Sequence, residues 1–296
     1  MNYYFLPGTG IYGGIKVGFQ FALMLTELGV PIVAATPDGR APEWFRSSVP
    51  VLPHAAVLAG LRPEDTVLFS FPDDYRRLKA TPARLLFHCQ GTDPQIDPIL
   101  SDGDVGLLAC WEQAAGYMAE RAGRRPIEVG IAISDCFYYD GRHNRPDDVA
   151  YMPRRGREIA EAAADACPGL NFVAIDVLGE EQAAGIMKRS AYYVATSVGE
   201  WFGLPALEAM AAGCVVVSVP TVGGGIFLHD GETAIVASAD AVPGRLAALA
   251  GPDGESLRAR LRDNGMARAR AYSRGRQVER LRGLLDGPLR PVLSWT

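Results

Sequence analysis

The chain has 296 residues, of which 48% are hydrophobic and 21% charged, a balance that is typical of globular proteins and excludes disordered, collagen-like and coiled-coil classes. The formal net charge is −5 and the chain has no run of five lysines and arginines, so the sequence predicts no nucleic-acid partner. At roughly 100–200 residues per domain, the length predicts two domains.

Three features of the sequence predict a cytoplasmic protein. The N-terminal run MNYYFLPGTG lacks a basic stretch and is interrupted by Pro7 and Gly8, so we expect a first strand there and not a signal peptide. The sequence lacks the ~20 consecutive apolar residues that a transmembrane helix needs. The five cysteines are scattered and form no CxxC pair, as is typical of buried thiols in a reducing compartment.

Short apolar runs alternate with segments of helical periodicity in the first part of the chain. Continuous apolar strands joined by helices indicate a parallel sheet that is covered on both faces. One expected helix ends at Gly123, a residue suited to a helix C-terminus. Strands are expected at 3–6, 30–36, 66–71, 84–89, 105–110 and 126–133, and helices at 16–29 and 110–123.

The segment 134–148 is rich in Asp, Gly, Pro and Asn, and we interpret it as an interdomain linker. A second alternating series follows it, with strands expected at 149–153, 171–176, 191–197, 214–220 and 234–238, and helices at 157–167, 180–190, 205–213, 240–250 and 254–271. The predicted fold is α/β, with two Rossmann-like doubly wound parallel-sheet domains, 1–146 and 147–275. The sequence leaves open whether the C-terminal segment 276–296, which contains a last helix, packs back on the first domain.

The stretch 199–213, GEWFGLPALEAMAAG, carries the strongest chemical signal. Glu200 follows an apolar strand, Gly203 permits a tight turn, Pro205 suits the first turn of a helix, and Glu208 falls about one turn into that helix. The free N–H groups and the dipole of such a helix attract an anion such as phosphate. Glu208 is then placed to accept both hydroxyls of a ribose, and Glu200 to reach a sugar beyond the phosphates.

With its surroundings, ExFGLPxLEAMAAGxxVV…GG…DGETxxxV, this glutamate pair resembles the nucleotide-sugar site of retaining GT-B glycosyltransferases, and of glycosyltransferase family 4 in particular. The resemblance is specific over about 190–240. It implies two domains that face a cleft, a compact N-terminal acceptor domain and a C-terminal donor domain. It further implies donor-binding roles for Phe202, Gly203, Leu204 and Pro205. Trp201 replaces the glycine usual in the family, which leaves the donor sugar open.

Two arginines follow the strand expected at 149–153. The resemblance implies that a basic pair near this strand end holds the donor diphosphate. Arg155 aligns best with the lysine of the family, and Arg154 is a substitute for its partner. A guanidinium can bind phosphate oxygens bidentately and neutralise a departing diphosphate. The alternative is a solvated arginine cluster, although positive charge at a helix N-terminus is unfavourable to the helix dipole.

The loop after the first strand allows three interpretations. Gly8, Gly10 and Gly13 match the dinucleotide-binding fingerprint, with Asp38 as a ribose partner. The resemblance instead implies that Gly13 and Gly14 bring backbone amides towards the donor diphosphate or the acceptor. A tight turn that needs glycines is the third interpretation.

His88 lies at the carboxyl end of an expected strand, where open sheets bind ligands. The resemblance implies that His88 contacts the transferred sugar and that Gln90 and Asp93, in the loop that follows, meet the acceptor. A hydrogen-bonded histidine in the core is an equal alternative for this position.

The sequence predicts no metal site. Asp102–Gly103–Asp104 matches the DxD motif of the other large glycosyltransferase fold, but it precedes its strand where that motif should follow one, so we interpret it as a polar turn. The histidines and cysteines lack zinc spacing. The motifs of P-loop NTPases and α/β-hydrolases are also missing from the sequence.

The predicted function is therefore retaining, metal-independent transfer of a sugar from a nucleoside-diphosphate sugar to a sugar, glycan or small-molecule acceptor. Glu200, His88 and Arg155 form the expected catalytic group, and the sequence predicts no cofactor besides the donor co-substrate. A homo-oligomer or a partner subunit stays open. One alternative is an NAD(P)-binding oxidoreductase, which gives the motif residues of 199–238 no role. The other is a catalytically silent nucleotide-sugar-binding subunit, against which the intact glutamate pair argues.

Overall fold

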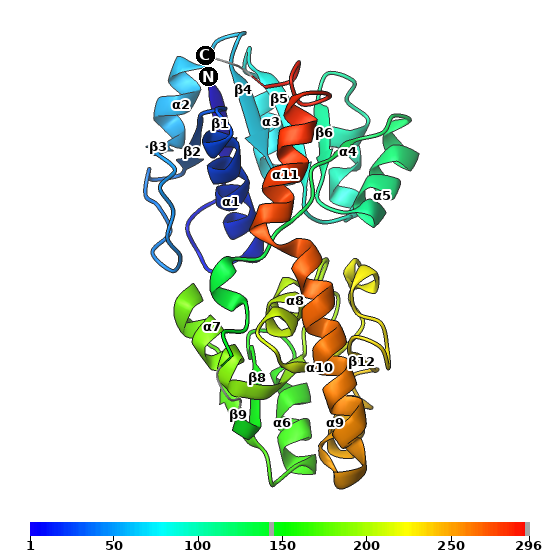
Figure 1. Ribbon diagram of the computed structural model, residues 1–296. Coiled ribbons are helices and arrows are strands. Elements are labelled where there is room, and N and C mark those ends of the chain that lie inside the picture. The colour runs from blue at the N-terminus through cyan, green and yellow to red at the C-terminus, as the bar shows by residue number, and fades with distance from the viewer. Residues whose placement is uncertain (142–144, 294–296) are drawn as a thin grey trace. The chain divides into compact units, whose positions relative to one another are not determined.

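The computed structural model describes residues 1–141 and 145–293, which divide into two units (Figure 1). The first unit comprises Met1–Ala132 together with the chain from Gly275, and the second comprises Ile133–Arg274. Most of the segment expected as a linker, 134–148, packs within the second unit. The Tyr138 hydroxyl there donates a hydrogen bond to the carbonyl of Ala269 at 3.0 Å. Residues 142–144 of that segment lie outside the described residues.

Seven parallel strands form the sheet of the first unit, in the order β3-β2-β1-β4-β5-β6-β7. The chain order reverses between β1 and β4, which is the point where open sheets of this class bind ligands at the carboxyl ends of their strands. The strands are β1 (Asn2–Phe5), β2 (Ile32–Thr36), β3 (Val51–Pro53), β4 (Thr66–Phe69), β5 (Arg84–Cys89), β6 (Gly106–Ala109) and β7 (Ile127–Glu128).

The C-terminal helix belongs to the core of this first unit. Leu281 and Leu285 are buried in the same apolar cluster as Tyr4 of β1 and Phe19 of the first helix. Removing these side chains from water is the main favourable term that holds the helix there. The helices of the unit are α1 (Gly13–Glu27), α2 (His54–Gly60), α3 (Pro72–Lys79), α4 (Asp97–Leu100), α5 (Glu112–Ala122) and α11 (Arg274–Leu285).

Some elements of the first unit differ from the expected ones. Helix α1 begins at Gly13, three residues before the expected start at 16, because the glycines join the helix. The strand expected at 126–133 is reduced to β7, and the chain soon reaches Gly130 with a φ of +82°. The short elements β3, α2 and α3 carry little periodic signal, since α3 buries only Asp74 and Leu78.

Five parallel strands form the sheet of the second unit, in the order β12-β11-β10-β8-β9. Here the chain order reverses between β8 and β10, so these two neighbours mark the expected ligand position. The strands are β8 (Arg145–Tyr151), β9 (Asn171–Ala174), β10 (Ser190–Ala195), β11 (Val215–Ser218) and β12 (Ile235–Val236). The helices are α6 (Arg157–Ala166), α7 (Glu180–Arg189), α8 (Leu204–Ala211), α9 (Val242–Ala250) and α10 (Glu255–Ala269).

Two further expectations can be compared with the structure. No helix within residues 1–141 and 145–293 is both long and apolar enough to cross a membrane. The five cysteines are all free thiols, and four of them are buried while Cys136 is partly exposed.

Candidate functional site

Arg155 and Glu200 meet at the reversal point of the second sheet. Arg155 follows β8 and Glu200 follows β10, and these strands are parallel neighbours whose carboxyl ends share one edge. The Arg155 Nη1 and Glu200 Oε2 atoms lie 3.8 Å apart, and the two side chains are 60% and 32% exposed. A pair this exposed contributes only about 0–1 kcal/mol to stability. Its charges therefore remain accessible to a ligand.

The backbone of Arg155 is fixed against the end of β10. The Thr196 hydroxyl donates a hydrogen bond to the Arg155 carbonyl at 2.6 Å. The next residue, Gly156, has a φ of +71°, and a Cβ there would lie 2.2 Å from the carbonyl oxygen of Thr196. Only glycine fits such a position without a shift of the backbone. Neither Thr196 nor Gly156 was predicted as part of the site, although a glycine between two arginines and a helix indicates a tight turn.

A tight turn at Gly203 sets the start of helix α8. Gly203 has a φ of +87° and no side chain with which to cap the helix, and Pro205 lies in the first turn. The amides of Ala206 and Leu207 donate back to the Gly203 carbonyl, at 3.0 and 3.3 Å. The helix therefore begins beside Glu200 with its positive dipole end at this sheet edge, as anion binding requires.

The glycine-rich loop after β11 holds the Glu200 segment from its other side. The amide of Val222 donates to the Glu200 carbonyl at 2.9 Å, and the amide of Gly223 donates to the Trp201 carbonyl. These two bonds fix the backbone that directly follows the Glu200 side chain. This support by the loop is a second feature that the motif alone did not reveal.

Glu208 lies inside helix α8 and is 5% exposed. Glutamates are rarely buried unless polar or charged partners compensate for the loss of water. The burial of Glu208 therefore argues against a merely solvated side chain. On the adjacent strand β10, the pKa of Tyr193 is raised, first by burial and then by the charges of Glu208, Cys214 and Glu200. The two glutamates, separated by seven residues in sequence, thus both act on one buried ring.

Phe202 and Leu204 direct their side chains into the protein. Phe202 is 4% exposed, and its ring centroid lies 5.3 Å from that of Phe227 and 6.0 Å from that of Tyr272. These aromatic contacts anchor the turn before α8. The contribution of the turn to anion binding is therefore expected from its backbone N–H groups and not from these side chains. Arg154, in contrast, is exposed in the turn after β8.

In the first unit, His88 is a fully buried residue of β5. The Tyr4 hydroxyl lies 2.8 Å from its Nδ1, and the Cys110 thiol lies 3.0 Å from its Nε2. Burial lowers the pKa of His88 to about 3, so the ring is neutral. Because both nitrogens are engaged by buried side chains, the geometry favours the core interpretation of His88 over contact with a sugar.

Gln90 lies against the start of α1. Its Nε2 donates to the Tyr4 hydroxyl at 3.2 Å, and a Cβ on Gly14 would lie 2.6 Å from its Oε1. Gly13 and Gly14 thus form the first turn of α1, and Gly14 gives Gln90 room. Asp93 accepts a hydrogen bond from the Gln95 amide at 2.8 Å and caps the following 3₁₀ turn, Pro94–Ile96.

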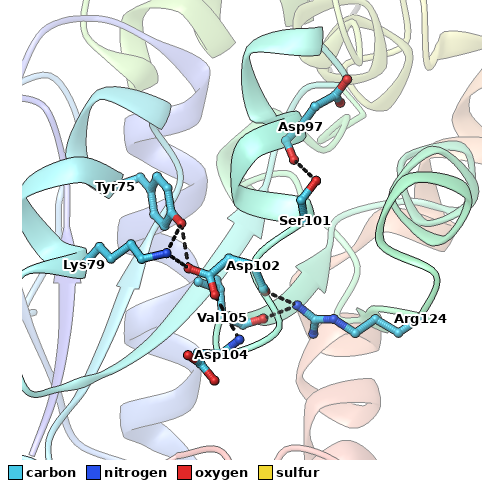
Figure 2. A network of polar contacts seen from close by, with 8 residues as sticks. All are labelled: Tyr75, Lys79, Asp97, Ser101, Asp102, Asp104, Val105 and Arg124. Atoms are coloured by element: carbon cyan, nitrogen blue, oxygen red, sulfur yellow. Dashed lines mark hydrogen bonds and ion pairs between the residues drawn. The ribbon is translucent and has the colours of Figure 1, made fainter.

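The acidic pair Asp102 and Asp104 forms a polar turn (Figure 2). Oδ2 of Asp102 accepts from the Tyr75 hydroxyl at 2.6 Å and from Lys79 Nζ at 2.7 Å, and Oδ1 accepts from the Asp104 amide. Hydrogen bonds from Lys79 and Tyr75 lower the pKa of Asp102 to about 2. The Asp102 carboxylate therefore has a structural role in this turn. Among the described residues, no group of three His, Cys, Asp or Glu side chains is arranged to hold a metal ion.

Asp38, the ribose partner in the dinucleotide interpretation, is bound within its own loop. Its Oδ1 accepts from the Arg40 amide at 3.2 Å, and its Oδ2 lies 3.6 Å from Arg40 Nε. Its side chain is 55% exposed. This geometry is that of a surface turn after β2.

Comparison with known proteins associates the second unit with one enzyme class. Residues 151–250 match the family described as Glycosyl transferases group 1, a range that contains Arg155, Glu200 and Glu208. No curated protein matches the chain by sequence.

Solved structures match almost the whole fold. HepE of Anabaena in complex with UDP-glucose has 13% identity and a TM-score of 0.74, with coverage of 96% of this chain and 99% of that one. Sucrose-phosphate synthase of Thermosynechococcus elongatus has 13% identity and a TM-score of 0.71, covering 98% and 99%. WaaG, described as a glycosyltransferase of lipopolysaccharide biosynthesis, has 12% identity and a TM-score of 0.69, covering 97% and 100%.

At such low identities these likenesses establish the fold alone, which is the GT-B fold with its two Rossmann-like units. The activity class rests on the family match over the second unit. The match of residues 151–250 to the group 1 glycosyltransferase family, together with the GT-B fold, supports a glycosyltransferase.

Proposed function

We propose that the chain transfers a sugar from a nucleoside-diphosphate sugar to an acceptor hydroxyl, with retention at the anomeric carbon and without a metal. The observation that carries this proposal is the meeting of Arg155, Glu200 and the start of α8 at one edge of the second sheet. An accessible cation, a carboxylate and a helix N-terminus together suit a diphosphate that is bonded to a sugar.

The donor diphosphate lies between Arg155 and the N-terminus of α8 in this proposal, with Arg154 as a second cation. In the free protein Arg155 is paired with Glu200 at 3.8 Å. Phosphate oxygens offer this guanidinium a bidentate acceptor of greater charge. Glu200 is then released to accept hydrogen bonds from the sugar hydroxyls, while Glu208 accepts those of the ribose.

The expected chemistry is mainly electrostatic. Departure of the diphosphate leaves an oxocarbenium-like sugar, and the arginines and the helix dipole stabilise the negative charge on the leaving group. The departing diphosphate accepts the proton of the attacking hydroxyl on the same face, which retains the configuration. A double displacement would need a carboxylate close beneath the anomeric carbon, and we assign none. Glu200 acts by orienting the sugar.

The acceptor side is proposed for the first unit, near Gln90, Asp93 and the start of α1. Gln90 is held by Tyr4 and lies close to Gly14, so its position is defined by the core beneath it. His88 supports this arrangement through its contact with the Tyr4 hydroxyl. Its role in the proposal is therefore structural.

The test is a transfer assay with a panel of nucleoside-diphosphate sugars and hydroxyl-bearing acceptors, carried out in excess EDTA. We expect transfer or donor hydrolysis with at least one donor, and NMR of the product should show the anomeric configuration of the donor. Arg155→Gln should lower kcat by roughly 100- to 1,000-fold, because one preorganised group that stabilises developing negative charge is worth roughly 2.7–4 kcal/mol.

Arg245→Gln is the matched control, because Arg245 is also about half exposed and paired with an acid, Asp230, outside the site. It should leave kcat unchanged. Turnover that depends on added metal, an inverted product, or equal activity of Arg155→Gln and the wild type would contradict the mechanism. A catalytically silent subunit would give no product with any donor.

A further inference from the structure

The second unit contains a cavity that the proposed reaction does not use. Its volume is about 420 Å³, within the usual range of small-molecule sites, ~300–1,000 Å³. Its lining includes two arginines, two tyrosines, one carboxylate and apolar side chains: Arg258, Arg262, Tyr139, Tyr192, Asp147 and Val215.

This cavity is at the opposite edge of the sheet from the Arg155 and Glu200 pair. Asp147, Tyr192 and Val215 lie near the starts of β8, β10 and β11, whereas Arg155 and Glu200 follow the ends of β8 and β10. Because the strands are parallel, their starts share one edge and their ends share the other. The cavity and the Arg155–Glu200 pair therefore lie at opposite ends of the strands.

The two arginines of the cavity are held in place before any ligand binds. Both come from α10 and are four residues apart, so they lie on one face of the helix. Arg258 Nη1 donates to the carbonyls of Leu249 and Gly251, the latter at 2.8 Å. Arg262 Nε donates to the Gly213 carbonyl at 2.9 Å, and its guanidinium lies 4.6 Å from the centre of the Tyr139 ring.

The Arg258 guanidinium has five N–H donors, and its two anchoring hydrogen bonds use only part of them. Within the part of the chain that the structure describes, the hydrogen bonds of Arg258 run through Nη1 alone. Its Nε and Nη2 donors are therefore available on a side chain that lines the cavity. A preorganised guanidinium loses little entropy when it binds an anion.

The charge and the lining together define the ligand. Two guanidinium groups outweigh the single carboxylate of Asp147, so the cavity favours an anion. The Tyr139 and Tyr192 rings and Val215 offer apolar surface to the remainder of the molecule. We propose that this cavity binds a small organic anion with a phosphate or carboxylate group on an apolar body.

Helix capping is the competing explanation for these arginines. Arg262 bonds a carbonyl just after α8, and Arg258 bonds carbonyls at the end of α9, where cations are favourable. Capping alone predicts that substitution lowers stability and that no anion binds. Ligand binding predicts a measured affinity that depends on Arg258.

The test is isothermal titration calorimetry of the full chain with phenyl phosphate, benzoate and neutral phenol. We expect phenyl phosphate or benzoate to bind at least tenfold more tightly than phenol, and the comparison of the two distinguishes a phosphate ligand from a carboxylate ligand. Arg258→Gln should weaken binding of the preferred anion about tenfold, because a charge-assisted hydrogen bond is lost. Arg260→Gln, on the same helix but outside the cavity, should leave the affinity unchanged.

Arg155→Gln distinguishes this cavity from the proposed donor site, and it should also leave the affinity for the anion unchanged. Arg258→Lys keeps the charge without the planar fork and should weaken binding about threefold, which provides a second test should Arg258→Gln fail to fold. The proposal is wrong if neither anion binds the wild type at 10 mM, if the Arg258 variants that fold bind as tightly as the wild type, or if Arg155→Gln abolishes the binding.

Discussion

Glu208 and His88 are both buried, and their burial has opposite implications. Glu208 is 5% exposed, and its charge, like that of Glu200, raises the pKa of the buried Tyr193. His88 has both ring nitrogens engaged by Tyr4 and Cys110. We propose ligand binding for Glu208, whereas the two engaged ring nitrogens of His88 favour a role in the core.

The pH dependence of stability tests the assignment of His88. The folded protein keeps this ring neutral down to a pKa of about 3, whereas an unfolded histidine titrates near 6.5. The unfolded state therefore binds more protons between these values, so stability is complete above about pH 6.5 and falls as the pH is lowered towards 3. The slope from this one group is at most about 1.4 kcal/mol per pH unit.

His88→Gln should remove this contribution, and the free energy of unfolding in urea should then fall less steeply between pH 6.5 and 5. His54, whose pKa is also lowered chiefly by burial, contributes to the slope in both proteins. His229→Gln, which changes a partly exposed histidine of the second unit, serves as the control and should keep the wild-type slope. An unchanged slope in His88→Gln would show that the ring is already protonated or solvated.

At the scale of elements, the turn between β8 and α6 is the most constrained part of the candidate site. Gly156 combines a positive φ with a close approach to the Thr196 carbonyl. The sequence predicted the strand and the helix on either side, because their apolar periodicity is regular. It could not predict the contact with β10, because that contact depends on the packing of strands far apart in the chain.

Gly156→Ala should destabilise the second unit by at least about 2 kcal/mol. Gly156 has a left-handed backbone, and the added Cβ would lie 2.2 Å from the carbonyl oxygen of Thr196. Urea unfolding followed by circular dichroism measures this loss. Gly244→Ala is the control, because Gly244 lies inside α9 and, among the described residues, no atom beyond its chain neighbours and the local helix backbone lies within 4 Å of the added Cβ. That variant should be neutral or stabilised by about 1 kcal/mol. Equal stabilities of the two variants would contradict the described turn.

Most helices and strands with clear turn residues or apolar periodicity were predicted correctly, whereas short polar elements were missed. The helix at Gly203–Pro205 was predicted from its turn residues, and α8 indeed begins at Leu204. Helix α3 was missed because its sequence PDDYRRLK is mostly polar and buries few side chains. The predicted position of His88 at a strand end was correct, but its burial depends on Tyr4 and Cys110 from neighbouring strands.

At the scale of the whole molecule, two open parallel sheets each reverse their chain order once, and the sequence predicted this architecture from alternating strands and helices. The reversal in the second unit coincides with the motif residues, which is why the sequence could propose specific residues for the donor side. The proposed acceptor side could not be predicted to the same degree, because the loops of the first unit carry no transferable sequence code.

The central claim is that the second unit binds a nucleoside diphosphate through Glu208 and its neighbours. The most direct measurement is calorimetric titration of the wild type and Glu208→Gln with UDP, GDP, TDP and NAD, with Glu232→Gln, an exposed glutamate of the same unit, as the control. We expect one nucleoside diphosphate to bind the wild type and the control equally, and Glu208→Gln to weaken that binding at least tenfold through loss of charged hydrogen bonds to the ribose. Binding of NAD alone, or nucleotide binding that is unaffected by Glu208→Gln, would contradict the account.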